Sequence, residues 1–162
     1  MRFALIAVAL SLALSAAAAA APSRAKVALR ATALGRVLAD AHGRTLYVFD
    51  RDVRGRSACS GACAATWPPF LTTGTPVALA GVPATRLGTA KRADGRLQVT
   101  YMGRPLYFFA TDRRAGQLAG AAVAHWAALT AAGTRLHKSS TSTPTPSPSP
   151  APPPYGGGGD GY

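Results

Sequence analysis

The sequence contains no glutamate and has only six acidic residues against 18 lysines and arginines, so its formal net charge is +12. A surface this basic attracts anionic partners such as wall polymers, lipid headgroups and nucleic acid. The arginines are scattered along the chain rather than collected in one run. The pattern therefore favours general basicity over a specific anion site. The sequence does not identify the partner; an anionic envelope polymer or surface is one candidate class, and we expect no specific nucleic-acid binding.

Motifs of the common enzyme classes are also missing. The chain has no glycine-rich phosphate loop, no histidine pair typical of metalloproteases and no Gly-x-Ser-x-Gly nucleophile elbow. Asp50 and Asp52 are close enough in sequence for paired acid–base work. Their neighbours include Arg51 and Arg54, which favours a solvated loop in which opposite charges compensate. We therefore expect neither enzymatic activity nor a cofactor.

Cysteine is scarce as well, with only Cys59 and Cys63 in the chain. An even pair in an exported protein indicates a disulfide bond. A spacing of four residues puts both side chains on one face of a helical turn, within bridging distance. Thiol-exchange motifs have two residues between their cysteines, whereas three separate this pair. No cysteine lies near residues 18–23, so the expected mature N-terminus has no acceptor for a lipid anchor.

Both ends of the chain differ in composition from its middle. Met1 and Arg2 precede an apolar run and then small residues, the arrangement of a secretory signal peptide over residues 1–21. Residues 139–162 are rich in Pro, Ser, Thr and Gly, which cannot build a core, so we expect a disordered tail. One domain remains, over residues 22–138. We expect it to be secreted or periplasmic, with no transmembrane segment after cleavage and no lipid anchor.

The middle of the chain repeats itself after 60 residues. Residues 35–52 read GRVLADAHGRTLYVFDRD, and residues 95–112 read GRLQVTYMGRPLYFFATD. The identical pairs are Gly35 and Gly95, Arg36 and Arg96, Gly43 and Gly103, Arg44 and Arg104, Leu46 and Leu106, Tyr47 and Tyr107, Phe49 and Phe109, and Asp52 and Asp112. Trp67 and Trp126 also correspond, with a slip of one residue. This predicts two copies of one unit, about 26–70 and about 86–130, that share a core.

Short apolar runs separated by Gly-Arg pairs predict the structure of each copy. Glycine supplies the positive φ that a tight hairpin turn needs, and Asp94-Gly95 is a strong hairpin signal. We expect three-strand antiparallel meanders with strands near 26–33, 36–42 and 44–50, and near 86–93, 96–102 and 104–110. The predicted fold is mainly β, with two tandem meander repeats packed as one small domain and a short helical or looped segment that carries the cysteines.

The third strand of each copy carries the most distinctive residues. Tyr47 and Phe49 point to one face of the first copy's strand, and apolar neighbours point to the other, so we expect both faces to be covered. Tyr107 and Phe109 repeat this pattern in the second copy. We expect the two aromatic faces to be the place where the copies meet.

Asp52 and Asp112 lie just beyond these strands. Short acidic side chains accept hydrogen bonds from loop N–H groups, so the structural interpretation assigns two aromatics to the core and one aspartate to the turn in each copy. The functional alternative is a shallow site formed by the tyrosine hydroxyls and these two carboxylates. Such a site needs its groups to be exposed and convergent.

A metal, haem or redox site is a further alternative. His42 and Met102 occupy the same position of the repeat, just before its second Gly-Arg turn. If the copies pair about a pseudo-twofold axis, these residues could approach each other, and His and Met together with thiolates suit copper. Two cysteines in an exported protein usually oxidise to each other, however, and a histidine before a turn glycine is an ordinary exposed residue.

The repeated pattern resembles a bacterial family of secreted or lipoprotein repeats with the motif Tyr-x-(Phe/Trp/Tyr)-x-x-Asp. The motif residues are Tyr47, Phe49 and Asp52, then Tyr107, Phe109 and Asp112. The stretch SACSGACAATWPPF also resembles the family's cysteine and Trp-Pro-Pro segment, and the resemblance covers about residues 30–132. Many members look like lipid-anchored proteins, whereas this chain lacks the anchor cysteine.

The family resemblance implies a secreted repeat and no established activity. We therefore expect a non-enzymatic cell-envelope repeat protein of unknown ligand that serves as a binding or structural module. The alternative is an extracytoplasmic protein that handles a metal, haem or redox equivalents through Cys, His and Met.

Overall fold

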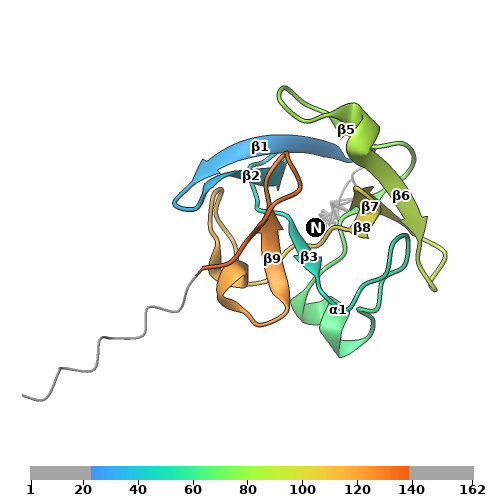
Figure 1. Cartoon of the computed structure of the whole chain (residues 1–162). Helices are drawn as coiled ribbons and strands as arrows, with labels where there is room; N and C mark the ends of the chain where they lie inside the picture. The colour runs from blue at the N-terminus through green and yellow to red at the C-terminus, as the bar shows by residue number, and fades with distance from the viewer. Residues whose placement is uncertain (1–22, 139–162) are drawn as a thin grey trace, which may run out of the picture.

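The structure, a computed structural model, describes residues 23–138 (Figure 1). The expected signal peptide and the expected disordered tail lie outside the described residues. Within the described range no helix has the length and apolar character needed to cross a membrane.

The elements are short and mostly β. The first half contains β1 (Lys26–Thr32), β2 (Gly35–Asp40), β3 (Tyr47–Phe49), α1 (Ala62–Thr66), β4 (Leu71–Thr72) and β5 (Val77–Ala78). The second half contains a 3-10 turn η1 (Ala84–Arg86), β6 (Leu87–Lys91), β7 (Leu97–Tyr101), β8 (Arg104–Pro105), a second 3-10 turn η2 (Ala119–Ala122), β9 (Trp126–Leu129) and β10 (Arg135–Leu136).

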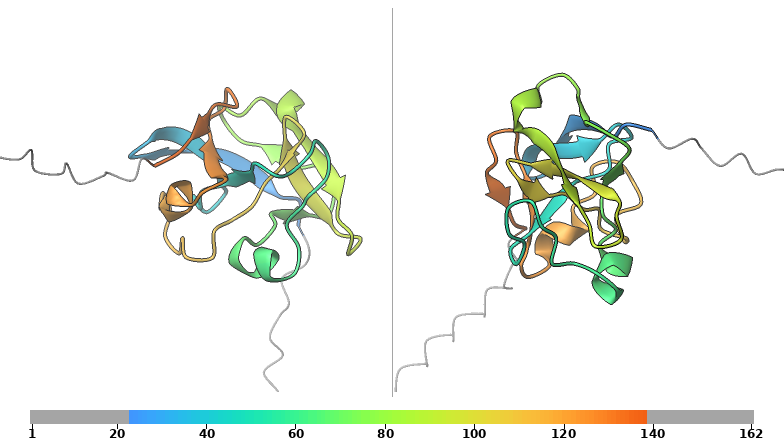
Figure 2. Two further views of the ribbon diagram at one scale, coloured as in Figure 1. Left: turned by 60° about the horizontal axis from the view of Figure 1, so that its bottom comes forward. Right: turned by 90° about the vertical axis from the view of Figure 1, so that its right-hand side faces the viewer.

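The strands form three small sheets. Their orders are β2-β1-β5, β10-β9-β3 and β4-β7-β6, with β8 also paired to β7. All pairs between these strands are antiparallel except β1 with β5. The expected mainly β fold, with antiparallel strands and a short cysteine segment, is confirmed. That segment, with α1, lies at the periphery of the molecule in each view (Figures 1 and 2).

Each copy begins with the expected hairpin. Thr32 pairs with Gly35 at the end of β1 and β2, and Lys91 pairs with Leu97 at the end of β6 and β7. The turn glycines have the positive φ that the sequence required, 103° at Gly35 and 80° at Gly95. These turns depend only on neighbouring residues, so the local sequence is sufficient to predict them.

The third strands differ from the expectation. They were expected to follow their own copy's second strand over residues 44–50 and 104–110, but only their first halves do so. The Leu46 N–H donates to the Leu38 carbonyl at 2.9 Å, and the Leu106 N–H donates to the Val99 carbonyl at 2.9 Å. Beyond this point the strand leaves its sheet, and Phe49 lies opposite Trp126 of the second copy.

The exchange between the copies is reciprocal. The Phe70 N–H donates to the Leu106 carbonyl at 2.9 Å, and the Val99 N–H donates to the Phe70 carbonyl at 2.8 Å, so the end of the first copy extends the second copy's sheet. At the centre, Tyr47 and Tyr107 exchange both backbone hydrogen bonds, at 2.9 and 3.0 Å. The third strand leaves the meander of its own copy because it has two apolar faces, and both can be buried only between the copies.

Two hydrophobic clusters lie on the two sides of the third strands. One contains Leu46, Val48 and Leu106, and the other contains Tyr47 and Tyr107. All five side chains are fully buried. The expected alternation, and the expected burial of both faces, is confirmed. The core is therefore built by both copies together, and neither has one of its own.

A chain cut between Ala80 and Gly81 tests this shared core. We expect fragments 23–80 and 81–138 to be unfolded separately, because each leaves its third strand without the partner from the other copy. An equimolar mixture should restore a folded complex, as measured by the dispersion of amide NMR signals. A native-like spectrum from either fragment alone would contradict the exchange.

Candidate functional site

The two tyrosines of the repeated motif lie at the centre of the molecule. Neither side chain has exposed area. The Tyr47 hydroxyl donates a hydrogen bond to Asp112 Oδ2, and the Tyr107 hydroxyl donates one to Asp52 Oδ2 at 2.8 Å. Each tyrosine thus bonds to the motif aspartate of the other copy, which explains why the motif occurs twice.

The second carboxylate oxygen of each aspartate holds the loop that follows it. Asp52 Oδ1 accepts a hydrogen bond from the Ala58 N–H at 2.7 Å, and Asp112 Oδ1 accepts one from the Ala119 N–H at 3.0 Å. The expected role of these carboxylates in loops is therefore confirmed. Each aspartate also connects its own loop to the other copy, a link that the motif spacing alone does not reveal.

Four aromatic rings from both copies form a continuous stack. Phe49 stacks on Trp126 at a centroid distance of 4.4 Å, Trp126 stacks on Trp67 at 3.7 Å, and Trp67 packs on Phe109 at 4.4 Å. Each tryptophan lies between the other tryptophan and the motif phenylalanine of the other copy. The expected meeting of the copies at the aromatic faces is confirmed, and stacks of this kind stabilise beyond the area they bury.

Burial sets the acid–base character of the motif. It raises the pKa of Tyr47 well above the ordinary value, and the bonded Asp112 carboxylate raises it further. Burial likewise raises the pKa of Tyr107, where Ser57 opposes the rise and Asp52 adds to it. The hydroxyls converge on the carboxylates but are not exposed, so they lack one of the two conditions for the shallow site considered above.

The Asp52 end of the motif contains a polar network built around an arginine, whereas at the Asp112 end the Thr45 hydroxyl bonds to the Gln117 carbonyl at 2.6 Å. The Tyr107 hydroxyl lies 2.7 Å from Ser57 Oγ. Arg92 Nη1 donates to Ser57 Oγ at 2.9 Å and to Gln98 Oε1 at 2.6 Å, and its Nη2 donates to the Cys59 carbonyl at 2.7 Å. Burial raises the pKa of Asp52, opposed by the Ala58 N–H, the Tyr107 hydroxyl and the Arg92 charge. The sequence carries no signal of this network, because Arg92 stands just before the exposed turn at Asp94-Gly95.

Cys59 and Cys63 form the expected disulfide bond, with their Cα atoms 5.3 Å apart. Cys59 is buried, and its carbonyl is the acceptor for Arg92 noted above. The bond closes the loop that leads into α1 and leaves no thiolate on either sulfur as a metal ligand.

The structure places His42 and Met102 in different hollows. His42 is exposed beside Asp40 and Arg44, and Met102, 43% exposed, lies with Arg54 and Arg104. Among residues 23–138, no three or more His, Cys, Asp or Glu side chains gather where they could hold a metal ion. The structure thus brings neither the two side chains nor thiolates together for the alternative metal or redox site.

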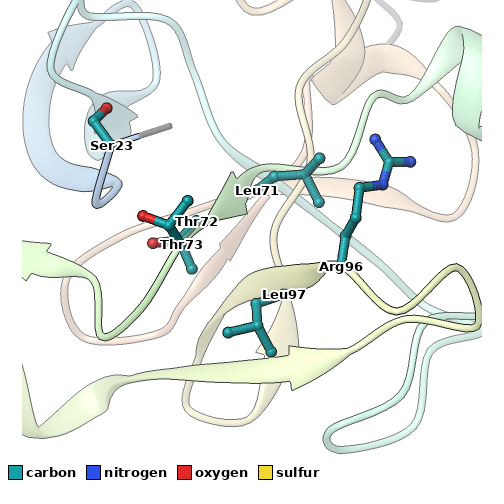
Figure 3. A pocket seen from close by; sticks show the side chains of 6 residues that line it. All are labelled: Ser23, Leu71, Thr72, Thr73, Arg96 and Leu97. Carbon is teal, nitrogen blue, oxygen red and sulfur yellow. The ribbon is translucent and has the colours of Figure 1, made fainter. Parts of the chain in front are cut away.

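A wide hollow of about 600 Å³ lies beside β4 and β7 (Figure 3). Leu71 and Leu97 line its middle, and the guanidinium of Arg96 lies at the end away from Ser23. Arg96 is already bonded to Asp94, with Nη2 and Oδ2 2.7 Å apart. Ser23, Thr72 and Thr73 also line the hollow, and the Thr72 hydroxyl donates to the Gly74 carbonyl at 2.8 Å. Its charged side chain is thus already paired, and one of its hydroxyls is bonded within the chain, so it gives little support for a ligand site.

Replacement of Gly120 tests the close packing around the motif. A Cβ at this position would lie 2.8 Å from Tyr47 Cζ and 2.9 Å from Trp67 Cη2, both parts of rigid rings. We expect Gly120→Ala to lower the free energy of unfolding by about 1–3 kcal/mol, measured by urea unfolding. Gly74→Ala is the control because no heavy atom lies within 4 Å of its Cβ position. Equal stability of the two variants would contradict the packing described.

The raised pKa values of Tyr47 and Tyr107 predict loss of stability in alkali. Their contribution is complete below the ordinary tyrosine pKa of about 10 and is lost as pH rises toward the folded-state values. Above pH 10 the unfolded chain releases two protons that the folded chain keeps, so stability falls by up to about 2.7 kcal/mol per pH unit. Tyr47→Phe should halve this slope in denaturant titrations at several pH values. An unchanged slope would show that Tyr47 is not its source.

The comparisons with known proteins agree with this two-copy arrangement. Residues 28–70 and 88–130 each match the model of a family described as a secreted repeat of unknown function. No curated protein and no solved structure matches the chain. The two matched segments include both copies of the motif and more than half of the 162 residues. The chain therefore belongs to this family of secreted repeats.

Proposed function

We propose that this protein is a non-enzymatic binding module of the cell envelope. It acts outside the cytoplasmic membrane and attaches to anionic polymers or surfaces there. The observation that carries the proposal is that the tyrosine hydroxyls and aspartate carboxylates of the repeated motif bond to each other inside the molecule. The surface that remains accessible to a partner is basic, and the two copies together form the scaffold beneath it.

The carboxylates support this proposal because every one of them between residues 23 and 138 already has a partner within the protein. Asp52 and Asp112 bond to the motif tyrosines. The other three, Asp40, Asp50 and Asp94, form ion pairs with arginines. The basic residues outnumber these carboxylates, so many of them face solvent without a carboxylate partner.

The exposed arginines without an ion pair among the described residues come from both copies and from the segment before them: Arg24, Arg30, Arg36, Arg51, Arg54, Arg56, Arg104, Arg113 and Arg114. Arginine donates paired hydrogen bonds to phosphate and carboxylate and stays charged at every physiological pH. A surface of this kind attracts anionic polymers over distances comparable with the Debye length.

Attachment to isolated bacterial walls tests the proposed function. We expect the protein to sediment with walls and to do so much less after hydrofluoric acid has removed their phosphate-linked polymers. Attachment should also weaken as salt rises from about 0.1 M to 1 M, because the Debye length falls from about 10 Å to about 3 Å. Equal sedimentation with treated and untreated walls, or no sedimentation with either, would overturn the proposal.

A further inference from the structure

A hollow of about 370 Å³ lies between the disulfide loop and the end of β6. Its charged lining consists of Arg56, Lys91 and Arg92, and Ser57 and Ser60 add hydroxyl groups. Arg56 and Lys91 are exposed and form no ion pair among residues 23–138. The hollow thus combines three positive charges with hydrogen-bond donors.

Arg92 is held in this hollow as a buried cation. Its side chain is 7% exposed, and the network described above fixes both of its terminal nitrogens. Its Nε is buried and has no hydrogen-bond partner in the described part of the chain. A buried donor without an acceptor is costly, so an acceptor that entered the hollow and reached this group would gain a strong, charge-assisted bond.

The neighbouring carboxylates neutralise the three cations only in part. Asp94 Oδ2 is 3.8 Å from Arg92 Nε, beyond hydrogen-bond distance, and it accepts two hydrogen bonds from Arg96. Asp52 is bonded to the Tyr107 hydroxyl and the Ala58 N–H. Two carboxylates with other partners face three cations, so the site keeps a positive charge.

The two copies differ at the residues that build this site. Counted by the 60-residue repeat, Arg92 corresponds to Thr32, Gln98 to Leu38, and Ser57 to Gln117. Leu38 is fully buried in the hydrophobic core, so the first copy has no counterpart of the glutamine that holds the arginine. Within residues 23–138 the residues that build the cationic hollow in the second copy are therefore not repeated in the first, which separates the hollow from the features that the fold itself requires.

We propose that this hollow binds a phosphate group carried by a larger anionic molecule. Arginine, lysine and hydroxyl groups are the donors that proteins direct at phosphate oxygens, and the hollow has room for a phosphate together with atoms attached to it. The inference rests on the proposed function and assigns the place where attachment occurs. The phosphate can come from a wall polymer or from a lipid headgroup, since the chemistry recognised is the same.

The first test follows the Arg92 Nε–H signal in NMR spectra of the full chain during titration with inorganic phosphate at constant ionic strength. We expect a saturable shift of this signal and of the backbone amides of residues 57–60. A response spread evenly over all arginine signals, or an unmoved Arg92 signal, would overturn the site.

The second test removes charge without touching the buried network. We expect Arg56→Ala combined with Lys91→Ala to weaken inorganic phosphate binding by about tenfold. The control, Arg113→Ala combined with Arg114→Ala, removes the same charge from exposed positions that do not line the hollow and should change binding by less than about twofold. Equal losses in both double variants would show general basicity instead of a site.

The carrier of the phosphate is identified with two further probes at equal phosphate concentration, polyphosphate and phosphatidylglycerol vesicles. Tighter binding of one of them than of inorganic phosphate supports a larger ligand and tells a polymer from a headgroup. If neither probe binds more tightly than inorganic phosphate, the proposal that the phosphate belongs to a larger molecule is wrong. Wall sedimentation by the Arg56 and Lys91 double variant separates the two proposals. If the double variant attaches to walls as the native protein does, the proposed phosphate site is wrong but the proposed function stands. If phosphate shifts the Arg92 signal but the native protein does not attach to walls, the site stands and the proposed function is wrong.

Discussion

The fold depends on one interaction made twice, the hydrogen bond from each motif tyrosine to the motif aspartate of the other copy. A tyrosine hydroxyl buried this deeply needs an acceptor, and burying it without one would be costly. The aspartate that accepts it also holds the loop after its own third strand, at Ala58 or Ala119. Loss of either aspartate would therefore affect both copies at once, because it releases a loop in one copy and removes the carboxylate acceptor of the tyrosine in the other. The four-ring stack lies beside these bonds, and it needs both third strands in place.

The features that could be predicted from the sequence are the local ones. Gly35 and Gly95 specify their turns through backbone conformation, and the alternation around Tyr47 indicates a strand covered on both faces. The spacing of Cys59 and Cys63 is sufficient for a disulfide. The partner of the third strand could not be predicted in this way, because Phe49 meets Trp126 far along the chain and many pairings satisfy the same alternation. The close approach of Gly120 to Tyr47 and Trp67 likewise has no signal in composition.

Arg92 illustrates the same limit at the candidate site. In the sequence it stands before Ala-Asp-Gly and has the appearance of a solvated residue at a hairpin turn. Its burial arises because Ser57 and the Cys59 carbonyl come from a loop of the other copy and cover it. The general basicity read from composition is compatible with this, but only the packing of the two copies separates one arginine from the rest. The duplicated motif forms the scaffold, and residues that differ between the copies, such as Arg92, can provide specificity for a ligand.

The exchange of strands has a consequence for how a secreted chain reaches its destination. Proteins made from the N-terminus usually fold domain by domain as each part becomes available. Here the first copy waits for Asp112 and Trp126, which are synthesised and exported after it, before Tyr47 has its acceptor and Phe49 its neighbour. Both hydrophobic clusters contain residues of the two copies, so we expect neither half to fold before the other is present. The same reciprocity that makes the finished molecule one unit should delay its folding until the second copy is available.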